Sequence, residues 1–134
     1  MIIFVYGTLL KGLERAHVLS SSPYLGPALA QAQLFDLGSY PGISAGNDNV
    51  IGELYEVNPE TLAELDSIEG YLENSPESSL YLRKTFTAQK FADGSTVDVQ
   101  AYFYSGPSGT IIEDGDYRSF RIQNEHPERQ WIIA

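Results

Sequence analysis

Glu69 is the residue of this sequence with the clearest potential for acid–base chemistry. In the stretch LAELDSIEGY, residues 62 to 71, Leu62, Leu65 and Glu69 recur at spacings of three and four, so a helix places them on one face. A carboxyl group on an apolar face loses hydration, and the last turn of a helix carries partial negative charge. Both effects raise its pKa toward the range that a general acid–base catalyst needs. The alternative is a glutamate that bends to solvent or accepts a hydrogen bond from a tyrosine or an amide.

A glycine turn follows the first predicted strand, in the stretch FVYGTLL, residues 4 to 10. Residues 2 to 6 are apolar on both faces of a strand, Gly7 ends that strand, and Thr8 is placed to cap a short helical segment that runs to about Leu19. Free backbone N–H groups at such a junction can hold a carboxylate or a developing oxyanion. As a bare motif, the same residues are better explained by a plain strand-to-helix turn.

A nucleophile-elbow pattern occurs at residues 42 to 46, GISAG, with Ser44 at its centre. Asp98 and His126 follow in the chain order of an α/β-hydrolase triad. The elbow needs a strand before the serine and a helix after it, whereas here Tyr40-Pro41 precedes and Asn-Asp-Asn follows, which is turn chemistry. A serine hydrolase is therefore the weakest of the alternatives.

The sequence gives no pattern for a metal or a cofactor. It contains no cysteine, and His17 and His126 lie far apart without ligand spacing. The acidic run at residues 113 to 116 lacks a calcium-loop pattern and is typical of a solvated turn. We expect neither a metal nor a cofactor.

Composition limits the partners and the location. The chain has 134 residues, 43% of them hydrophobic, and a formal charge of −10. So acidic a protein is not expected to bind nucleic acid or an anionic membrane surface, because both need exposed Lys and Arg. The start, MIIFVYG, lacks the basic region of a signal peptide, and no apolar run is long enough to span a membrane. We expect a cytoplasmic protein, with its oligomeric state left open.

The elements that position these residues predict an α+β fold in a single domain of residues 1 to 134. Asn58-Pro59-Glu60 starts the helix that carries Glu69, and Gly70 ends it. Further strands are predicted at residues 32 to 37 and 50 to 57, with a turn-rich loop at 38 to 49 between them. After a polar loop at 72 to 79, a hairpin joins residues 81 to 91 to 97 to 104 through Asp93-Gly94. The tail from 111 to 134 is not assigned.

Seven blocks of the chain, in order, resemble the gamma-glutamylcyclotransferase family in its compact bacterial YtfP/AIG2-like branch. They are YGTL at 6 to 9, LFDLGSYPGI at 34 to 43, VIGELYEV at 50 to 57, LDSIEGY at 65 to 71, Tyr81-Leu82-Arg83, AYFY at 101 to 104 and IEDGDYR at 112 to 118. The ordered set covers about residues 1 to 118 and is far more specific than YGTL alone.

This resemblance implies a small, mainly antiparallel β-barrel-like sheet with a few flanking helices and a cavity at one side. It implies that Glu69 is the catalytic acid–base, and that Tyr6, Gly7, Thr8 and Leu9 grip the γ-glutamyl end of the substrate. Tyr81 and Tyr104 match positions of pocket hydroxyls in the family. The stretch between Glu69 and Tyr81 is longer than expected for compact members, which bears on the placement of Tyr81.

The resemblance also implies a reaction. The α-amine of a γ-glutamyl amine or amino acid attacks its own γ-carbonyl, which closes a lactam and releases 5-oxoproline. Such an enzyme, of lyase or acyltransferase type, needs no cofactor, since the nucleophile is part of the substrate. A non-catalytic protein that binds small molecules in the same pocket remains the main alternative, followed by the Ser44 hydrolase.

Overall fold

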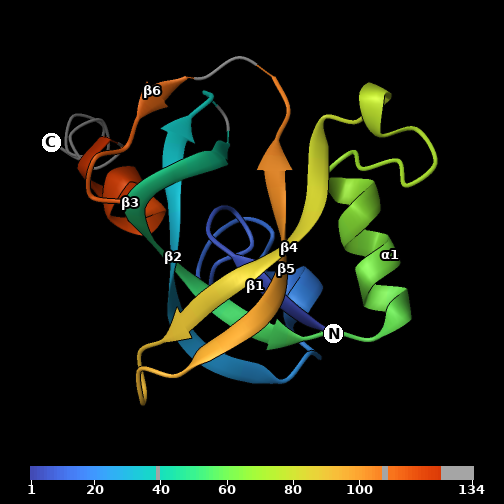
Figure 1. Cartoon of the computed structure of the whole chain (residues 1–134), viewed down its shortest axis with the longest axis horizontal. Coiled ribbons are helices and arrows are strands. Elements are labelled where there is room, and N and C mark those ends of the chain that lie inside the picture. The colour runs from blue at the N-terminus through green and yellow to red at the C-terminus, as the bar shows by residue number, and fades with distance from the viewer. Residues whose placement is uncertain (39, 107–108, 125–134) are drawn as a thin grey trace, which may run out of the picture.

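A closed β-barrel with helices packed outside it forms the framework of the protein (Figure 1). The computed structural model describes residues 1–38, 40–106 and 109–124. Its strands are β1 (Ile2–Val5), β2 (Tyr24–Asp36), β3 (Pro41–Glu56), β4 (Tyr81–Lys90), β5 (Thr96–Tyr104) and β6 (Thr110–Ile111). The hydrogen-bonded order is β3-β1-β5-β4-β2-β6, and a further pairing of β2 with β3 closes the barrel and leaves β6 outside it. Only β1 and β5 run parallel among these pairs, so the expected mainly antiparallel barrel-like α+β fold is confirmed.

The strands β2 and β3 are much longer than the sequence predicted. The loop expected at residues 38 to 49 is wrong from Pro41 onward, because these residues pair with β2 across the hairpin. Turn-forming residues are accommodated by a register shift: Ala32 lies opposite Asp48, whereas Gln33 lies opposite Ser44. The extra residues 45 to 47 form an exposed bulge, which uses the glycine and asparagine that had suggested a loop.

The helical segment expected from Thr8 to Leu19 is also wrong for most of its length. The chain makes successive tight turns, with Leu10 N–H donating to Gly7 O and Leu13 N–H to Leu10 O, both at 3.0 Å. Only Ala16–Leu19 forms a helix, the 3₁₀ helix η1. Gly12 has a φ of 85°, which no right-handed helix contains, so the helix cannot run through it.

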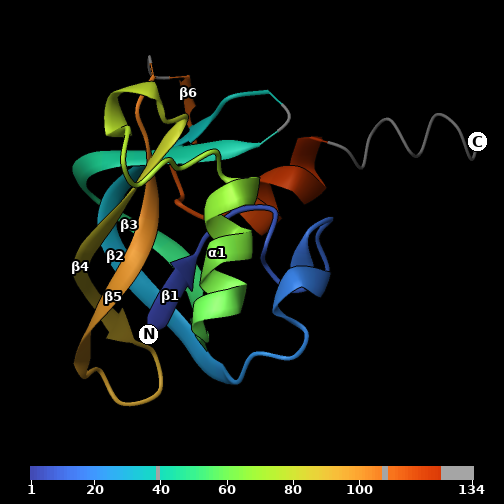
Figure 2. The same cartoon turned by 90° about the vertical axis from the view of Figure 1, so that its right-hand side faces the viewer.

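The helix α1 (Pro59–Ile68) and the β4–β5 hairpin are where the sequence placed them. The Asn58 side chain caps α1 by accepting a hydrogen bond from Thr61 N–H at 2.7 Å. Gly94, with a φ of 73°, forms the hairpin turn as predicted. Figure 1 shows α1 along one side of the barrel, and Figure 2, turned by 90°, shows η1 beside it. The unassigned tail contributes β6 and a helix at residues 117 to 124; residues 125 to 134 lie outside the described residues.

At Gly52, strand β3 approaches the end of β1 closely. A methyl group at this position would lie 2.4 Å from the Val5 carbonyl oxygen and 2.5 Å from Phe4 Cζ. We predict that Gly52→Ala lowers the free energy of unfolding by about 1–3 kcal/mol, because β1 must shift to relieve the overlap. Ser44→Thr adds one methyl group at a partly exposed site of the same strand and should change stability by less than about 0.5 kcal/mol. Urea denaturation of both variants tests this, and equal stability of Gly52→Ala and the parent protein would contradict the packing.

Candidate active site

The C-terminal end of α1 positions Glu69. Gly70 follows it in the left-handed conformation, with a φ of 66°, as predicted for the residue that ends this helix. The amides of Gly70 and Tyr71 donate to the carbonyls of Ser67 at 3.2 Å and Asp66 at 2.9 Å, which is a Schellman termination. The helix therefore stops within one residue of Glu69 and fixes the backbone from which its side chain extends.

A cavity lies between the end of α1, the turn after β1 and the barrel wall. It brings together six of the seven site residues predicted from the sequence. These are Glu69, the four residues from Tyr6 to Leu9, and Tyr81. The complete lining is Phe4, Val5, Tyr6, Gly7, Thr8, Leu9, Arg15, Tyr40, Pro41, Ile68, Glu69, Leu80, Tyr81 and Tyr102.

Burial raises the pKa of Glu69 to about 7, and the positive charge of Arg15 opposes that rise. The side chain is half-buried, and no other described residue donates a hydrogen bond to its carboxyl group. The position at the negative end of α1 disfavours the ionised form further. A carboxyl group with a pKa near 7 can both accept and return a proton at neutral pH.

The tyrosines that face Glu69 are held neutral. The Tyr6 hydroxyl donates to the Tyr102 carbonyl at 2.7 Å, and the Tyr81 hydroxyl donates to the Pro41 carbonyl at 2.6 Å. Burial is the main cause that raises the pKa of both phenols, and the charge of Glu69 raises it further. Neither phenol is therefore a base near pH 7. Among the described lining residues, Glu69 is the group suited to move a proton.

The turn after β1 contributes Gly7, Thr8 and Leu9 to the lining of the same cavity. The Gly7 carbonyl accepts from Leu10 N–H, and the Thr8 carbonyl accepts from Arg15 N–H at 2.9 Å, so the turn is fixed from both sides. The N–H groups of Gly7, Thr8 and Leu9 donate to no other described residue. Unpaired amides that line a cavity are available to an anionic or strongly polarised oxygen.

Sequence reasoning missed several lining residues and placed one incorrectly. Arg15 and Tyr40 carried no signal, since the turns that bring them to the cavity were predicted as a helix and as part of a long loop. Tyr102 belongs to the AYFY block, but the sequence analysis predicted Tyr104 of that block as the residue of the pocket. Tyr104 does not line the cavity: its ring packs edge-on against that of Tyr81, with centroids 5.4 Å apart.

Comparison with known proteins assigns the family. The model of the family "Gamma-glutamyl cyclotransferase, AIG2-like" matches residues 3–119. The chain belongs to this family. The family and the fold therefore agree with the resemblance in the sequence.

Individual relatives extend over most of the chain. The gamma-L-glutamyl-butirosin B gamma-glutamyl cyclotransferase of Niallia circulans is 31% identical over 124 residues, which cover 91% of this chain and 78% of that one. The Escherichia coli K12 family protein YtfP is 42% identical over 69 residues, 51% of this chain and 61% of YtfP. The solution structure of Escherichia coli YtfP has a TM-score of 0.63 at 33% identity and covers 87% of this chain and 96% of YtfP. A Mus musculus AIG2-like protein has a TM-score of 0.70 at 25% identity, covering 87% of this chain and 86% of that one.

The long loop between Glu69 and Tyr81 is tied at its base. Ser79 is buried, and its hydroxyl accepts from Leu72 N–H at 2.8 Å, while Leu80 N–H donates to the Gly70 carbonyl at 3.0 Å. These bonds join the two ends of the loop to each other. Tyr81 lies in the cavity wall with 3% of its surface exposed.

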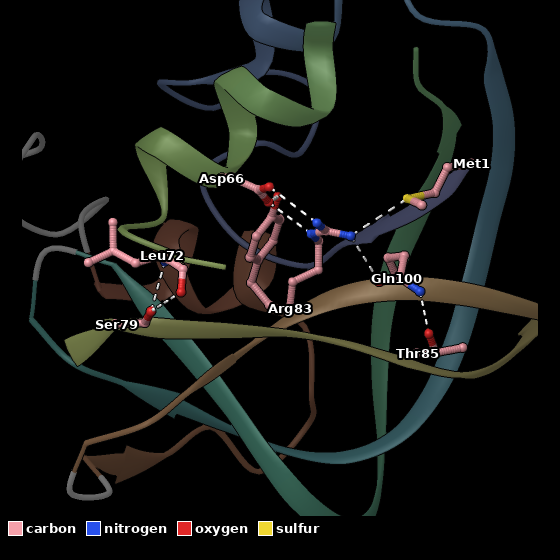
Figure 3. Close-up of polar contacts among 8 residues, drawn as sticks. Met1, Asp66, Leu72, Ser79, Arg83, Thr85 and Gln100 are labelled. Carbon is pink, nitrogen blue, oxygen red and sulfur yellow. Dashed lines mark hydrogen bonds and ion pairs between the residues drawn. The ribbon is translucent and has the colours of Figure 1, made fainter. Parts of the chain in front are cut away.

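A charged network behind the cavity fastens α1 to the barrel (Figure 3). Arg83 of β4 donates to both carboxylate oxygens of Asp66, at 2.9 and 3.3 Å, and to Gln100 of β5 at 3.3 Å. The Tyr102 hydroxyl donates to Asp66 at 2.6 Å. Since Tyr102 also receives the Tyr6 hydroxyl on its carbonyl, the network connects the helix that carries Glu69 with the end of β1.

Ser44 lies inside β3, opposite Gln33. Among the described residues, its hydroxyl donates a hydrogen bond to the neighbouring Ala45 carbonyl alone, at 3.5 Å, and strand, not helix, directly follows it. The strained turn that a nucleophile elbow requires is therefore missing, and the pattern at residues 42 to 46 is a coincidence of strand sequence. His126, the third member of that hypothesis, lies outside the described residues.

The described part of the chain offers no cluster of three His, Cys, Asp or Glu side chains that could hold a metal ion. None of the helices in residues 1–38, 40–106 and 109–124 has the length and apolar character that a membrane crossing requires.

The raised pKa of Glu69 predicts a pH-dependent loss of stability. Between its usual pKa of 4.5 and about 7, the folded protein holds this proton more tightly than the unfolded chain, so stability falls as the pH rises through that window. We predict that Glu69→Gln is more stable than the parent protein by about 1–3 kcal/mol at pH 8, allowing for solvent that reaches the cavity, and that the gain shrinks toward pH 5.

Urea unfolding at several pH values measures this difference. Glu73→Gln, in the exposed loop, is the control and should show no such trend. A stability gain in Glu69→Gln that does not vary with pH would contradict a carboxyl group that titrates near neutrality.

The Asp66–Arg83 pair generates a second prediction. Its side chains are only 19% and 13% exposed, so removal of one partner leaves the other charge partly buried. We expect Asp66→Asn and Arg83→Gln each to destabilise the protein by about 2 kcal/mol, and the double variant to lose clearly less than the sum. Thermal and urea unfolding measure the cycle. Glu56→Gln is the control: it removes a more exposed ion pair with the N-terminus and should lower the free energy of unfolding by under about 1 kcal/mol. Strictly additive losses in the Asp66 and Arg83 variants would contradict the coupling of these two residues.

Proposed function

We propose that this protein is a gamma-glutamylcyclotransferase that converts a γ-glutamyl amine or a γ-glutamyl amino acid into 5-oxoproline and the free amine, with Glu69 as general acid–base. Family membership supports cyclotransferase activity in general terms. The observation that carries the specific proposal is the shared cavity of Glu69, whose pKa is raised to about 7, and the unpaired amides of Gly7 to Leu9.

The reaction is an intramolecular acyl transfer. The α-nitrogen of the substrate forms a bond to its own γ-carbonyl carbon, and the bond from that carbon to the leaving nitrogen breaks. The product is a five-membered lactam. A pocket favours this step by holding the substrate in a folded conformation, since well-oriented intramolecular reactions reach effective concentrations of about 10⁵ M or more.

Glu69 serves both proton transfers. As a carboxylate it takes a proton from the α-ammonium group or from the attacking amine, and as a carboxylic acid it returns the proton to the departing nitrogen. A pKa near 7 suits both steps, because each protonation state is populated at neutral pH. The charge that develops on the γ-carbonyl oxygen, or the anionic end of the substrate, meets the amides of Gly7, Thr8 and Leu9.

The identity of the substrate class has further support. The Niallia circulans relative is named for a γ-L-glutamyl substrate, gamma-L-glutamyl-butirosin B. The cavity walls provide the neutral hydroxyls of Tyr6 and Tyr81, which already donate to backbone carbonyls and thus present only their acceptor sides. Those acceptors suit an ammonium group beside Glu69.

We predict that Glu69→Gln folds normally and loses cyclotransferase activity by about two to four orders of magnitude, because glutamine cannot exchange a proton. The assay incubates protein with γ-glutamyl amines, γ-glutamyl amino acids and glutathione, and quantifies 5-oxoproline by mass spectrometry. Glu73→Gln and Glu77→Gln, both exposed in the loop, serve as controls and should retain activity, as should Ser44→Ala.

The same assay separates the alternatives. Absence of 5-oxoproline from every substrate, together with saturable binding of one of them, would identify a binding protein instead of an enzyme. Normal turnover by Glu69→Gln would show that another group moves the proton.

A further inference from the structure

The described lining residues of the cavity include one acidic side chain, Glu69, and one basic side chain, Arg15. The other lining residues are apolar, glycine, proline, threonine or tyrosine, and burial holds Tyr6, Tyr81 and Tyr102 neutral. Glu69 and Arg15 interact, because the charge of Arg15 lowers the pKa of Glu69. The described wall of the cavity is therefore uncharged except at Glu69 and Arg15.

Arg15 differs from the other arginines in the described part of the chain. Arg83, Arg118 and Arg121 each form an ion pair, with Asp66, Glu53 and Glu14 respectively. The guanidinium of Arg15 forms no hydrogen bond or ion pair with another described residue, although it is half-buried. Even its chain neighbour Glu14 pairs with Arg121 instead. A partly buried guanidinium without an acceptor is incompletely compensated for its lost hydration.

The backbone of Arg15 is fixed to the turn that faces the substrate. Its N–H donates to the Thr8 carbonyl at 2.9 Å, which joins the backbone of Arg15 to the segment of Gly7 to Leu9. A carboxylate is the ligand whose charge and planar geometry match a guanidinium best.

We propose that Arg15 binds the α-carboxylate of the substrate's γ-glutamyl end, and thereby restricts the enzyme to substrates with a free α-amino-acid group. This assignment rests on the proposed function. An α-amino acid carries an ammonium and a carboxylate on one carbon, and the cavity offers Glu69 for the first and Arg15 for the second. The amides of Gly7 to Leu9 are then left for the γ-carbonyl oxygen. Three different contacts around one carbon atom also distinguish the L from the D enantiomer.

A binding experiment tests this without turnover. The probes are 5-oxoproline and 2-pyrrolidinone, which differ only in the carboxylate, titrated into the full chain and followed by NMR. The parent protein should prefer 5-oxoproline, and Arg15→Gln should lose about tenfold to a hundredfold of that preference. Lys84→Gln removes the same charge from an exposed site outside the cavity and should keep the preference. An unchanged preference in Arg15→Gln, or no preference in the parent protein, overturns the proposal.

Kinetics identify which carboxylate Arg15 binds. With a γ-glutamyl amine, whose leaving group has no carboxylate, Arg15→Gln should raise KM as much as with a γ-glutamyl amino acid. An effect confined to the amino acid substrate would place Arg15 at the leaving group and refute the assignment. If no substrate turns over while the preference for 5-oxoproline over 2-pyrrolidinone still depends on Arg15, the proposed cyclotransferase activity is refuted and the carboxylate-binding role of Arg15 is supported. Melting temperatures of Arg15→Gln and Lys84→Gln that equal that of the parent protein would show that misfolding does not cause the changes in binding preference or KM.

Discussion

The site depends on one unfavourable electrostatic arrangement: a half-buried carboxyl group held at the C-terminal end of a helix, without a hydrogen-bond donor from the described residues. Burial at this position raises the pKa of Glu69 to about 7, and the positive charge of Arg15 limits that rise. A hydrogen bond from Tyr6 or Tyr81 would stabilise the carboxylate and return its pKa to the usual range. Both hydroxyls are instead directed to backbone carbonyls, so the carboxyl group stays able to accept a proton.

The fold maintains this arrangement by fixing the two segments that meet at the cavity. On the helix side, the Schellman termination at Gly70 sets the direction of Glu69, and the Asp66–Arg83 pair anchors α1 to β4. On the barrel side, the turn after β1 is fixed by its own carbonyls, which leaves its amides unpaired. The barrel thus acts as a rigid support, and electrostatic preorganisation of this kind is the usual source of large catalytic effects.

The sequence predicted those parts of the site that depend on local rules. The cap at Asn58, the stop at Gly70 and the apolar stripe place Glu69 correctly, because helix signals are short-range. Strand lengths and Arg15 were not predictable in the same way. Residues 41 to 49 have the composition of a loop and form a strand only because β2 pairs with them. The segment after Thr8 follows turns set by Gly12, and these turns, not any helical periodicity, bring Arg15 to the cavity.

The pKa of Glu69 in the free protein is the most direct test of this account. It can be measured by ¹³C NMR titration of the side-chain carboxyl carbon in selectively labelled protein, with the Glu69→Gln variant providing the assignment. We predict a midpoint near 7. A midpoint near 4.5, the usual value for glutamate, would show that the carboxyl group is hydrated or hydrogen-bonded in solution, and would contradict its role as the acid–base group of the cavity.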